Sequence, residues 1–121
     1  MRFLNVSGFC IKPDKQVAFQ QWVTANEQRI KASYPEGSEY GGIYAAVMSS
    51  EKDAGDFYWF DILDSYGALD RSAAAGKDPE SESSKIGQEF LEFVDMSREA
   101  GHSQTLLKSV VDATIWDAPH E

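Results

Sequence analysis

The sequence is poor in the residues on which metal and redox sites are built. It contains one cysteine and two histidines. The single cysteine, Cys10, excludes an internal disulfide and a cysteine-based zinc cluster, and its place in an apolar segment is typical of a small core residue. The two histidines, His102 and His120, offer no metal-ligand spacing. We therefore expect no metal and no tightly bound cofactor.

Basic residues and long apolar runs are also scarce. The chain has 11 Lys and Arg against 20 Asp and Glu, which gives a net charge of −9. Nucleic acid is a poor candidate partner, because phosphate binding needs a basic surface. No apolar run approaches the roughly 20 residues of a membrane span, and residues 1–7 lack the apolar core of a secretory signal. We expect no membrane partner and a cytoplasmic location.

Alternating apolar residues predict four strands. Pro13 and Asp14 stop the first, and a charged hairpin loop over Ser49–Asp56 joins the second to the third. Gly41 and Gly42 lie within a strand pattern, where they favour a bulge or close packing and not a phosphate-binding loop. The predicted strands are Phe3–Lys12, Glu39–Met48, Phe57–Leu63 and Thr105–Trp116.

Helical spacing predicts two helical regions between these strands. The first begins at Asp14 as N-cap, carries an apolar stripe from Phe19 to Tyr34, and ends at Pro35. The second is broken. A short helix capped by Asp64 or Ser65 runs through Ala75 to a stop at Gly76, and a longer helix opens at Asp78-Pro79, buries Ile86, Phe90, Phe93 and Val94, and ends at Gly101.

The order strand, helix, strand, strand, helix, strand predicts one α+β domain over residues 1–121. Its expected topology is the ferredoxin-like βαββαβ fold with an antiparallel four-stranded sheet. If strands one and three are neighbours, Asn5 or Ser7 approaches Trp59 or Asp61.

Strand alternation sorts the side chains into two faces, provided that no bulge shifts the register. An apolar face collects Leu4, Val6, Cys10, Ile43, Ala45, Val47, Phe60, Ile62, Val111, Ala113 and Ile115. A polar-aromatic face collects Phe3, Asn5, Ser7, Phe9, Tyr40, Tyr44, Met48, Phe57, Trp59, Asp61, Lys108, Val110, Asp112, Thr114 and Trp116. Aromatic walls with a few polar groups suit a ligand pocket, and they also suit a subunit interface.

Several residues of the polar-aromatic face are candidates for chemistry. Asp61 lies between aromatic residues and is a candidate general base with a raised pKa. Lys108 is a candidate to bind an anionic group, or to pair with Asp61 or Asp112. His102 is a candidate acid or base at the pocket mouth, or it contacts the last carbonyls of a helix. The alternative for the whole set is a group of surface or interface residues that pair with one another.

The chain resembles the dimeric α+β barrel superfamily, which includes antibiotic-biosynthesis monooxygenase-like and stress-responsive barrel domains. The resemblance covers about Arg2 to Trp116 and rests on strand order, domain size and the broken helical segment after Asp61–Tyr66. It implies a homodimer whose two sheets pack face to face, with ligands held between sheet and helices. Its oxygenase branches place an asparagine on the first strand and a tryptophan on the third, which Asn5 and Trp59 match.

The haem-degrading branch also needs a histidine on the helix after that tryptophan. Leu69, Asp70 and Arg71 occupy this region, which argues against haem.

We therefore expect a homodimer with a pocket for a hydrophobic or aromatic molecule. If it is an enzyme, it is a cofactor-independent oxygenase or isomerase in which Asp61 or His102 moves a proton and Asn5, Tyr44, Trp59 and Lys108 bind substrate. The alternative is a non-catalytic binding or assembly domain whose polar-aromatic face forms the homodimer interface.

Overall fold

The computed structural model describes residues 2–111, which form an antiparallel sheet and three α-helices. The sheet order is β2-β3-β1-β4, as the ferredoxin-like topology predicted. None of the described helices is long and apolar enough to cross a bilayer. The elements are β1 (Phe3–Phe9), a 3-10 turn η1 (Pro13–Lys15), α1 (Gln16–Ala32), β2 (Ser38–Ala45), β3 (Phe57–Leu63), α2 (Gly67–Lys77), α3 (Glu82–Leu91) and β4 (Ser103–Lys108).

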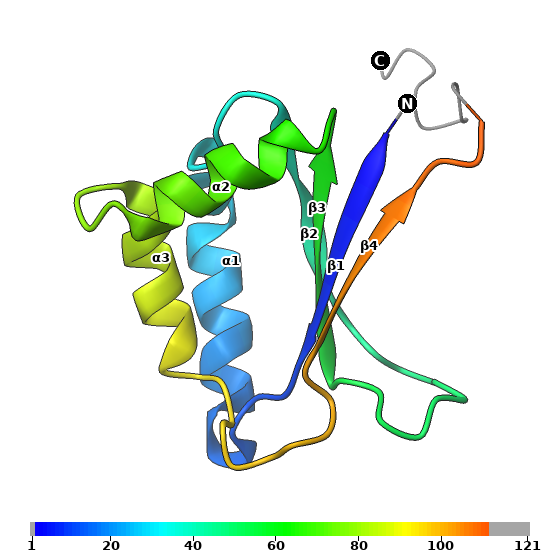
Figure 1. Ribbon diagram of the computed structural model, residues 1–121. Coiled ribbons are helices and arrows are strands. Elements are labelled where there is room, and N and C mark those ends of the chain that lie inside the picture. The colour runs from blue at the N-terminus through cyan, green and yellow to red at the C-terminus, as the bar shows by residue number, and fades with distance from the viewer. Residues whose placement is uncertain (1, 112–121) are drawn as a thin grey trace.

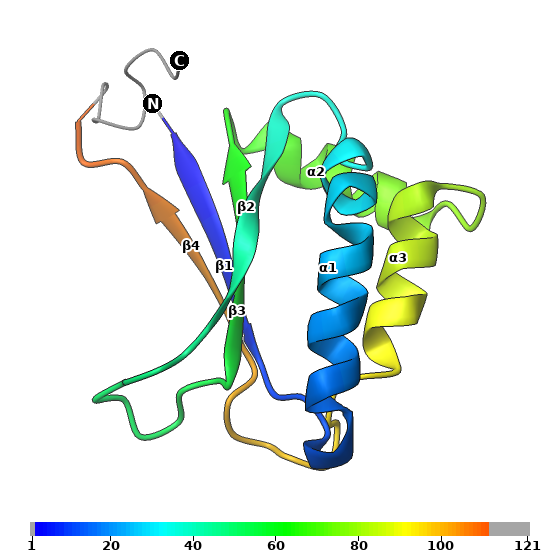
Figure 2. The same ribbon diagram turned by 180° about the vertical axis from the view of Figure 1, so that it is seen from behind.

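All three helices lie on one side of the sheet, and its other side is uncovered (Figures 1 and 2). The covered face is the one that carries Phe3, Asn5, Phe9, Phe57 and Asp61. Phe9 and Phe57 pack with Phe19 of α1, whose ring centroid lies 5.2 Å from that of Phe57. A second cluster joins Phe3 and Leu63 to Ala68 of α2.

This layering decides which predicted face meets the helices. The polar-aromatic residues of β1 and β3 are covered by the chain's own helices, so the proposal that they form a subunit interface is wrong. The open face carries Leu4 and Val6 of β1 with Phe60 and Ile62 of β3, which pair across the sheet.

A bulge at Gly41 changes the faces predicted for β2. The β2–β3 register shifts between Tyr40 and Gly42, and there is no room for a side chain at Gly41, where a Cβ would lie 2.9 Å from the Phe60 carbonyl oxygen. The bulge predicted at this pair of glycines is therefore confirmed. Because Ile43 pairs with Trp59 and Tyr44 pairs with Tyr58, Ile43 lies on the covered face and Tyr44 on the open face, which reverses both assignments.

Several predicted ends of elements were also wrong. β1 ends at Phe9, and only Ile11 continues as a single bridge to Val94. β2 ends at Ala45, three residues before the predicted end at Met48. β4 ends at Lys108, while predicted strand residues 112–116 lie outside the described residues.

The residues at the starts of the helices differ from the predicted capping residues, because the chain forms a 3-10 turn at Asp14 and the later helices begin further along the chain. Asp14 lies inside η1, and α1 begins at Gln16 without a side-chain cap. α2 begins at Gly67 without a side-chain cap from Asp64 or Ser65. α3 is capped by Ser81, whose hydroxyl accepts a hydrogen bond from the Ser84 amide at 3.1 Å, and it ends at Leu91.

Gly101 closes the loop that leads into β4 instead of ending a helix. Its φ is +89°, and an added Cβ would overlap the sulfur of Cys10. Cys10 is fully buried, as predicted for a core residue.

We expect Gly101→Ala to destabilise the fold by about 3 kcal/mol, because it combines backbone strain with a steric clash in the core. Urea unfolding measures this loss. Gly87→Ala is the matched control, since nothing lies within 4 Å of the added Cβ in the middle of α3. It should stabilise the protein by about 0.5–1 kcal/mol. Equal effects of the two substitutions would contradict the packing described here.

Candidate functional site

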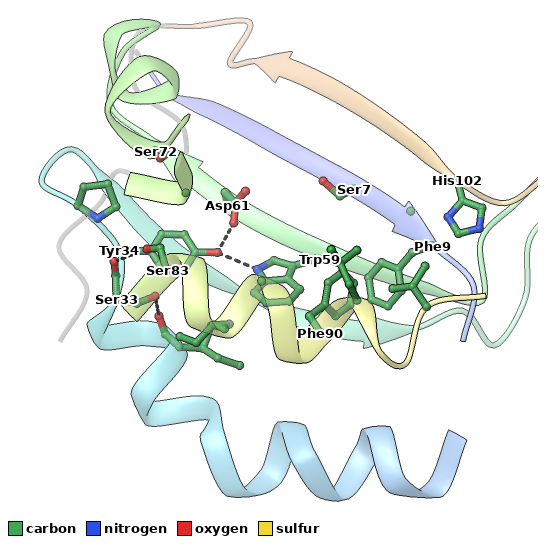
Figure 3. A pocket seen from close by; sticks show the side chains of 18 of the residues that line it. Ser7, Phe9, Ser33, Tyr34, Trp59, Asp61, Ser72, Ser83, Phe90 and His102 are labelled. Atoms are coloured by element: carbon green, nitrogen blue, oxygen red, sulfur yellow. Dashed lines mark hydrogen bonds between the residues drawn. The ribbon is translucent and has the colours of Figure 1, made fainter. Parts of the chain in front are cut away.

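A cavity of about 480 Å³ lies between the sheet and the helices (Figure 3). Small-molecule pockets commonly have about this size. Its floor is formed by Ser7 and Phe9 of β1 with Trp59 and Asp61 of β3. The helices and the following segment contribute Ile30, Ser33, Tyr34, Pro35, Ser72, Gly76, Ser83, Ile86, Gly87, Phe90, Leu91, Val94, Met96 and His102.

The side walls are aromatic. The ring of Phe90 in α3 meets Trp59 edge to face at a centroid distance of 5.2 Å and meets Phe9 at 4.8 Å. Tyr40 also packs against Trp59, with 6.2 Å between the ring centroids. Such contacts fix the indole ring of Trp59 in one orientation.

Asp61 is the centre of a hydrogen-bonded cluster at one end of the cavity. One carboxylate oxygen accepts a hydrogen bond from the Tyr34 hydroxyl, and the other accepts from the Asn5 amide at 3.1 Å. The Tyr34 hydroxyl also accepts a hydrogen bond from the Trp59 indole at 2.7 Å. Behind them, Gln104 of β4 donates to the Asn5 side-chain oxygen at 3.1 Å.

Strand register brings this cluster together. Asn5 and Asp61 are direct partners across β1 and β3, so their side chains lie on the same face, and Ser7 is likewise opposite Trp59. The predicted approach of Asn5 to Asp61 is confirmed. Tyr34 arrives from the turn that follows α1.

Burial raises the pKa values of two residues in this cluster, Asp61 and Tyr34. Removal from water raises the pKa of Asp61, and this effect outweighs the hydrogen bonds from Tyr34 and Asn5, which lower it. Burial and the nearby Asp61 charge raise the pKa of Tyr34, so Tyr34 keeps its proton and remains a donor. Within the described part of the chain, no lysine or arginine lines the cavity to offset the Asp61 charge.

His102 lies at the other end of the cavity from Asp61 (Figure 3). Its Nε2 atom is 3.1 Å from the backbone oxygen of Asp95. The two predicted acid–base residues therefore border the same cavity without forming a pair.

The predicted site residues divide into three groups. Trp59, Asp61 and His102 line the cavity, while Asn5, 8% exposed, contacts Asp61 from the neighbouring strand. Tyr44 and Lys108 line a separate groove of about 710 Å³ on the open face, so the structure does not bring them together with Asp61.

Tyr34 is the site residue that the sequence did not reveal. Its apolar spacing places it on the core stripe of the preceding helix, yet its hydroxyl lies between Trp59 and Asp61. A tyrosine directly before the Pro35 stop was the available signal, since the chain turns toward the sheet there.

The pH dependence of stability tests the state of Asp61. Because its pKa in the folded protein is raised above the ordinary value of 3.8, folding binds the proton more tightly. The stabilising contribution is complete below the ordinary pKa and is lost as pH rises through the raised value. The difference in Tm, Asp61→Asn minus wild type, should therefore increase from about pH 4 to about pH 8.

Asp70→Asn, at an exposed position of α2, is the control for the loss of a carboxylate away from the cavity. Differential scanning calorimetry measures both series. A difference for Asp61→Asn that falls with rising pH would show that the carboxylate is stabilised in the fold.

Several solved structures resemble this chain. Rv0793 from Mycobacterium tuberculosis aligns with a TM-score of 0.57 and 18% identity over 94% of this chain and 100% of its own. An uncharacterized NIPSNAP-like domain protein from Burkholderia xenovorans aligns with a TM-score of 0.65 and 8% identity over 93% and 89%. A protein provisionally assigned as an antibiotic biosynthesis monooxygenase from Chloroflexus aurantiacus J-10-fl aligns with a TM-score of 0.53 and 14% identity over 95% and 99%.

No family model and no curated protein matches the sequence. The likeness therefore concerns the fold. The chain has a ferredoxin-like fold, as its order of elements predicted, and it shares this fold with antibiotic-biosynthesis monooxygenase-like and NIPSNAP-like proteins.

Proposed function

We propose that this protein binds a hydrophobic or aromatic molecule between its sheet and helices and that Asp61 moves a proton of that molecule. The observation that carries the proposal is a carboxylate with a raised pKa at the end of an aromatic-walled cavity. The corresponding activity is a cofactor-independent isomerase or oxygenase.

Asp61 is suited to act as a general base. A base works best when its pKa lies near the working pH, and burial moves Asp61 in that direction. Asp61 would take a proton from an acidic C–H bond of the ligand, and return of that proton to another carbon completes an isomerisation. Dioxygen as oxidant would instead lead to oxygenation.

The neighbouring residues have supporting roles in this proposal. Trp59 would position the ring system of the ligand, and Asn5 would hold the Asp61 carboxylate in place through its 3.1 Å hydrogen bond. His102 would contact the far end of a long ligand and donate or accept a proton there. The monooxygenase assignment of the Chloroflexus aurantiacus neighbour is in keeping with the oxygenase form of the proposal.

We also propose that the protein is a cytoplasmic homodimer assembled through its open sheet face. This face carries a groove of about 710 Å³ lined by Leu4, Tyr44, Phe60, Ile62 and Leu107. Uncovered apolar surface of this kind marks an interaction site. A non-catalytic assembly domain is the alternative function, and this same face would serve it.

Proton exchange tests the catalytic proposal without knowledge of the natural substrate. 2-Tetralone is a neutral bicyclic ketone whose C–H bonds next to the carbonyl exchange slowly in D2O. Wild-type protein should accelerate this exchange, and Asp61→Asn should reduce the acceleration by about 100-fold, because it removes the base. Proton NMR follows the exchange.

Asp70→Asn is again the matched control and should retain the wild-type rate. Equal rates for wild type and Asp61→Asn would remove Asp61 from the chemistry. If the wild type binds the ketone without accelerating exchange, the non-catalytic alternative is favoured.

The dimer prediction concerns Phe60 at the centre of the open face. Phe60→Glu should weaken self-association by at least about 100-fold, because it places an unpaired charge in an apolar interface. Light scattering coupled to size exclusion measures the mass. Val17→Glu, at an exposed position of α1, should leave the mass unchanged. A dimer that survives Phe60→Glu, or a monomeric wild type, would contradict assembly through this face.

A further inference from the structure

We propose that the pocket selects its ligand by charge, so that the group next to Asp61 is neutral or positively charged and never a carboxylate or phosphate. This inference rests on the proposed binding function and names the class of ligand that the site takes.

The hydrogen bonds of the cluster already use the donors of Tyr34 and Trp59. The Tyr34 hydroxyl has one proton, which it donates to Asp61, and the Trp59 indole N–H is donated to Tyr34. What remains free on Asp61 and Tyr34 are lone pairs. A ligand group that contacts Asp61 and Tyr34 therefore meets acceptors there, while the neutral hydroxyls of Ser7 and Ser72 elsewhere in the lining carry no charge to offset Asp61.

The Asn5 amide does not change this balance. It donates to Asp61 from the neighbouring strand and is not among the residues that line the cavity. The Gln104 amide donates to the side-chain oxygen of Asn5. Because the oxygen of the Asn5 amide is turned toward Gln104, its NH2 group faces Asp61. Asn5 thereby holds the carboxylate in position and presents it to the cavity.

Two arginines on the helices that cover the sheet are engaged elsewhere, and Lys108 lies on the other face. Arg29 of α1 binds Glu82 and Glu89 of α3, with 2.7 Å between its Nη2 atom and Glu89. Arg71 of α2 donates to the Glu36 carbonyl at 2.8 Å, and Lys108 lines the groove on the open face. A ligand carboxylate beside Asp61 would therefore meet a like charge in a site with little water.

A positively charged ligand gains from the same surroundings. It would pair with a carboxylate that lacks a basic partner, and it would lie beside the aromatic rings of Trp59 and Phe90. Such rings attract ammonium groups through their π faces. A neutral hydroxyl gains a hydrogen bond to a charged acceptor, which is stronger than a neutral one.

Three compounds with one ring system separate these charges. They are 2-naphthalenemethanol, protonated 2-naphthylmethylamine and 2-naphthoate, titrated into the protein at about pH 8 by isothermal calorimetry, where the last two carry opposite charges. We expect the alcohol and the amine to bind at least about tenfold more tightly than the carboxylate. The tighter of the two identifies hydroxyl or ammonium as the preferred donor.

Two variants connect the selectivity to the cluster. Asp61→Asn removes the charge, so the preference over 2-naphthoate should fall to about twofold. Ser72→Lys adds a cation on α2, at the Asp61 end of the cavity in Figure 3, and should improve 2-naphthoate binding by about tenfold. Tyr44→Phe on the open face is the control and should change none of the affinities. Thermal melts establish that each variant is folded.

The outcomes separate the two proposals. If 2-naphthoate binds wild type as tightly as the alcohol and the amine, or if Asp61→Asn keeps the full selectivity, selection by charge is overturned while the binding pocket stands. If none of the three compounds binds, the proposed binding function fails and the selection rule fails with it.

Discussion

The antiparallel pairing of β1 with β3 is the constraint on which the site depends. It sets Asn5 opposite Asp61 and Ser7 opposite Trp59, and it turns all four side chains toward the helices. Because side chains alternate along a strand, a slip of one residue would move Asp61 to the open face and bring Ile62 inside. The buried packing of Phe3, Phe9, Phe57 and Leu63 opposes that slip, so the apolar core fixes the geometry of the polar cluster.

The sequence was sufficient for the order of elements, the strand neighbours and the juxtaposition of Asn5 with Asp61, since each follows from periodicity and topology. It was not sufficient for Tyr34 or Tyr44. Tyr34 reaches Asp61 only because the chain turns toward the sheet after α1, a path that spacing does not encode. Tyr44 changes face because Gly41 adds a residue to β2, which sequence alternation cannot locate.

The two faces of the sheet carry different sets of side chains. The covered face contains Asn5 and Asp61 among its buried aromatic residues, while the open face carries apolar residues such as Leu4, Phe60 and Ile62. Polar groups inside are tolerated because Tyr34, Asn5 and Gln104 satisfy one another and the carboxylate. An apolar exterior is costly to leave in water, which is why we propose that the covered face serves a ligand and the open face serves association.

The packing of Gly101 over Cys10 has a practical consequence. The thiol is fully buried under the loop that leads into β4, and its sulfur lies 3.7 Å from the Ala100 carbonyl oxygen. A thiol reagent can reach this sulfur only when that loop opens, because reactivity requires an accessible thiolate. The rate at which such a reagent modifies Cys10 therefore reports how often this loop opens locally.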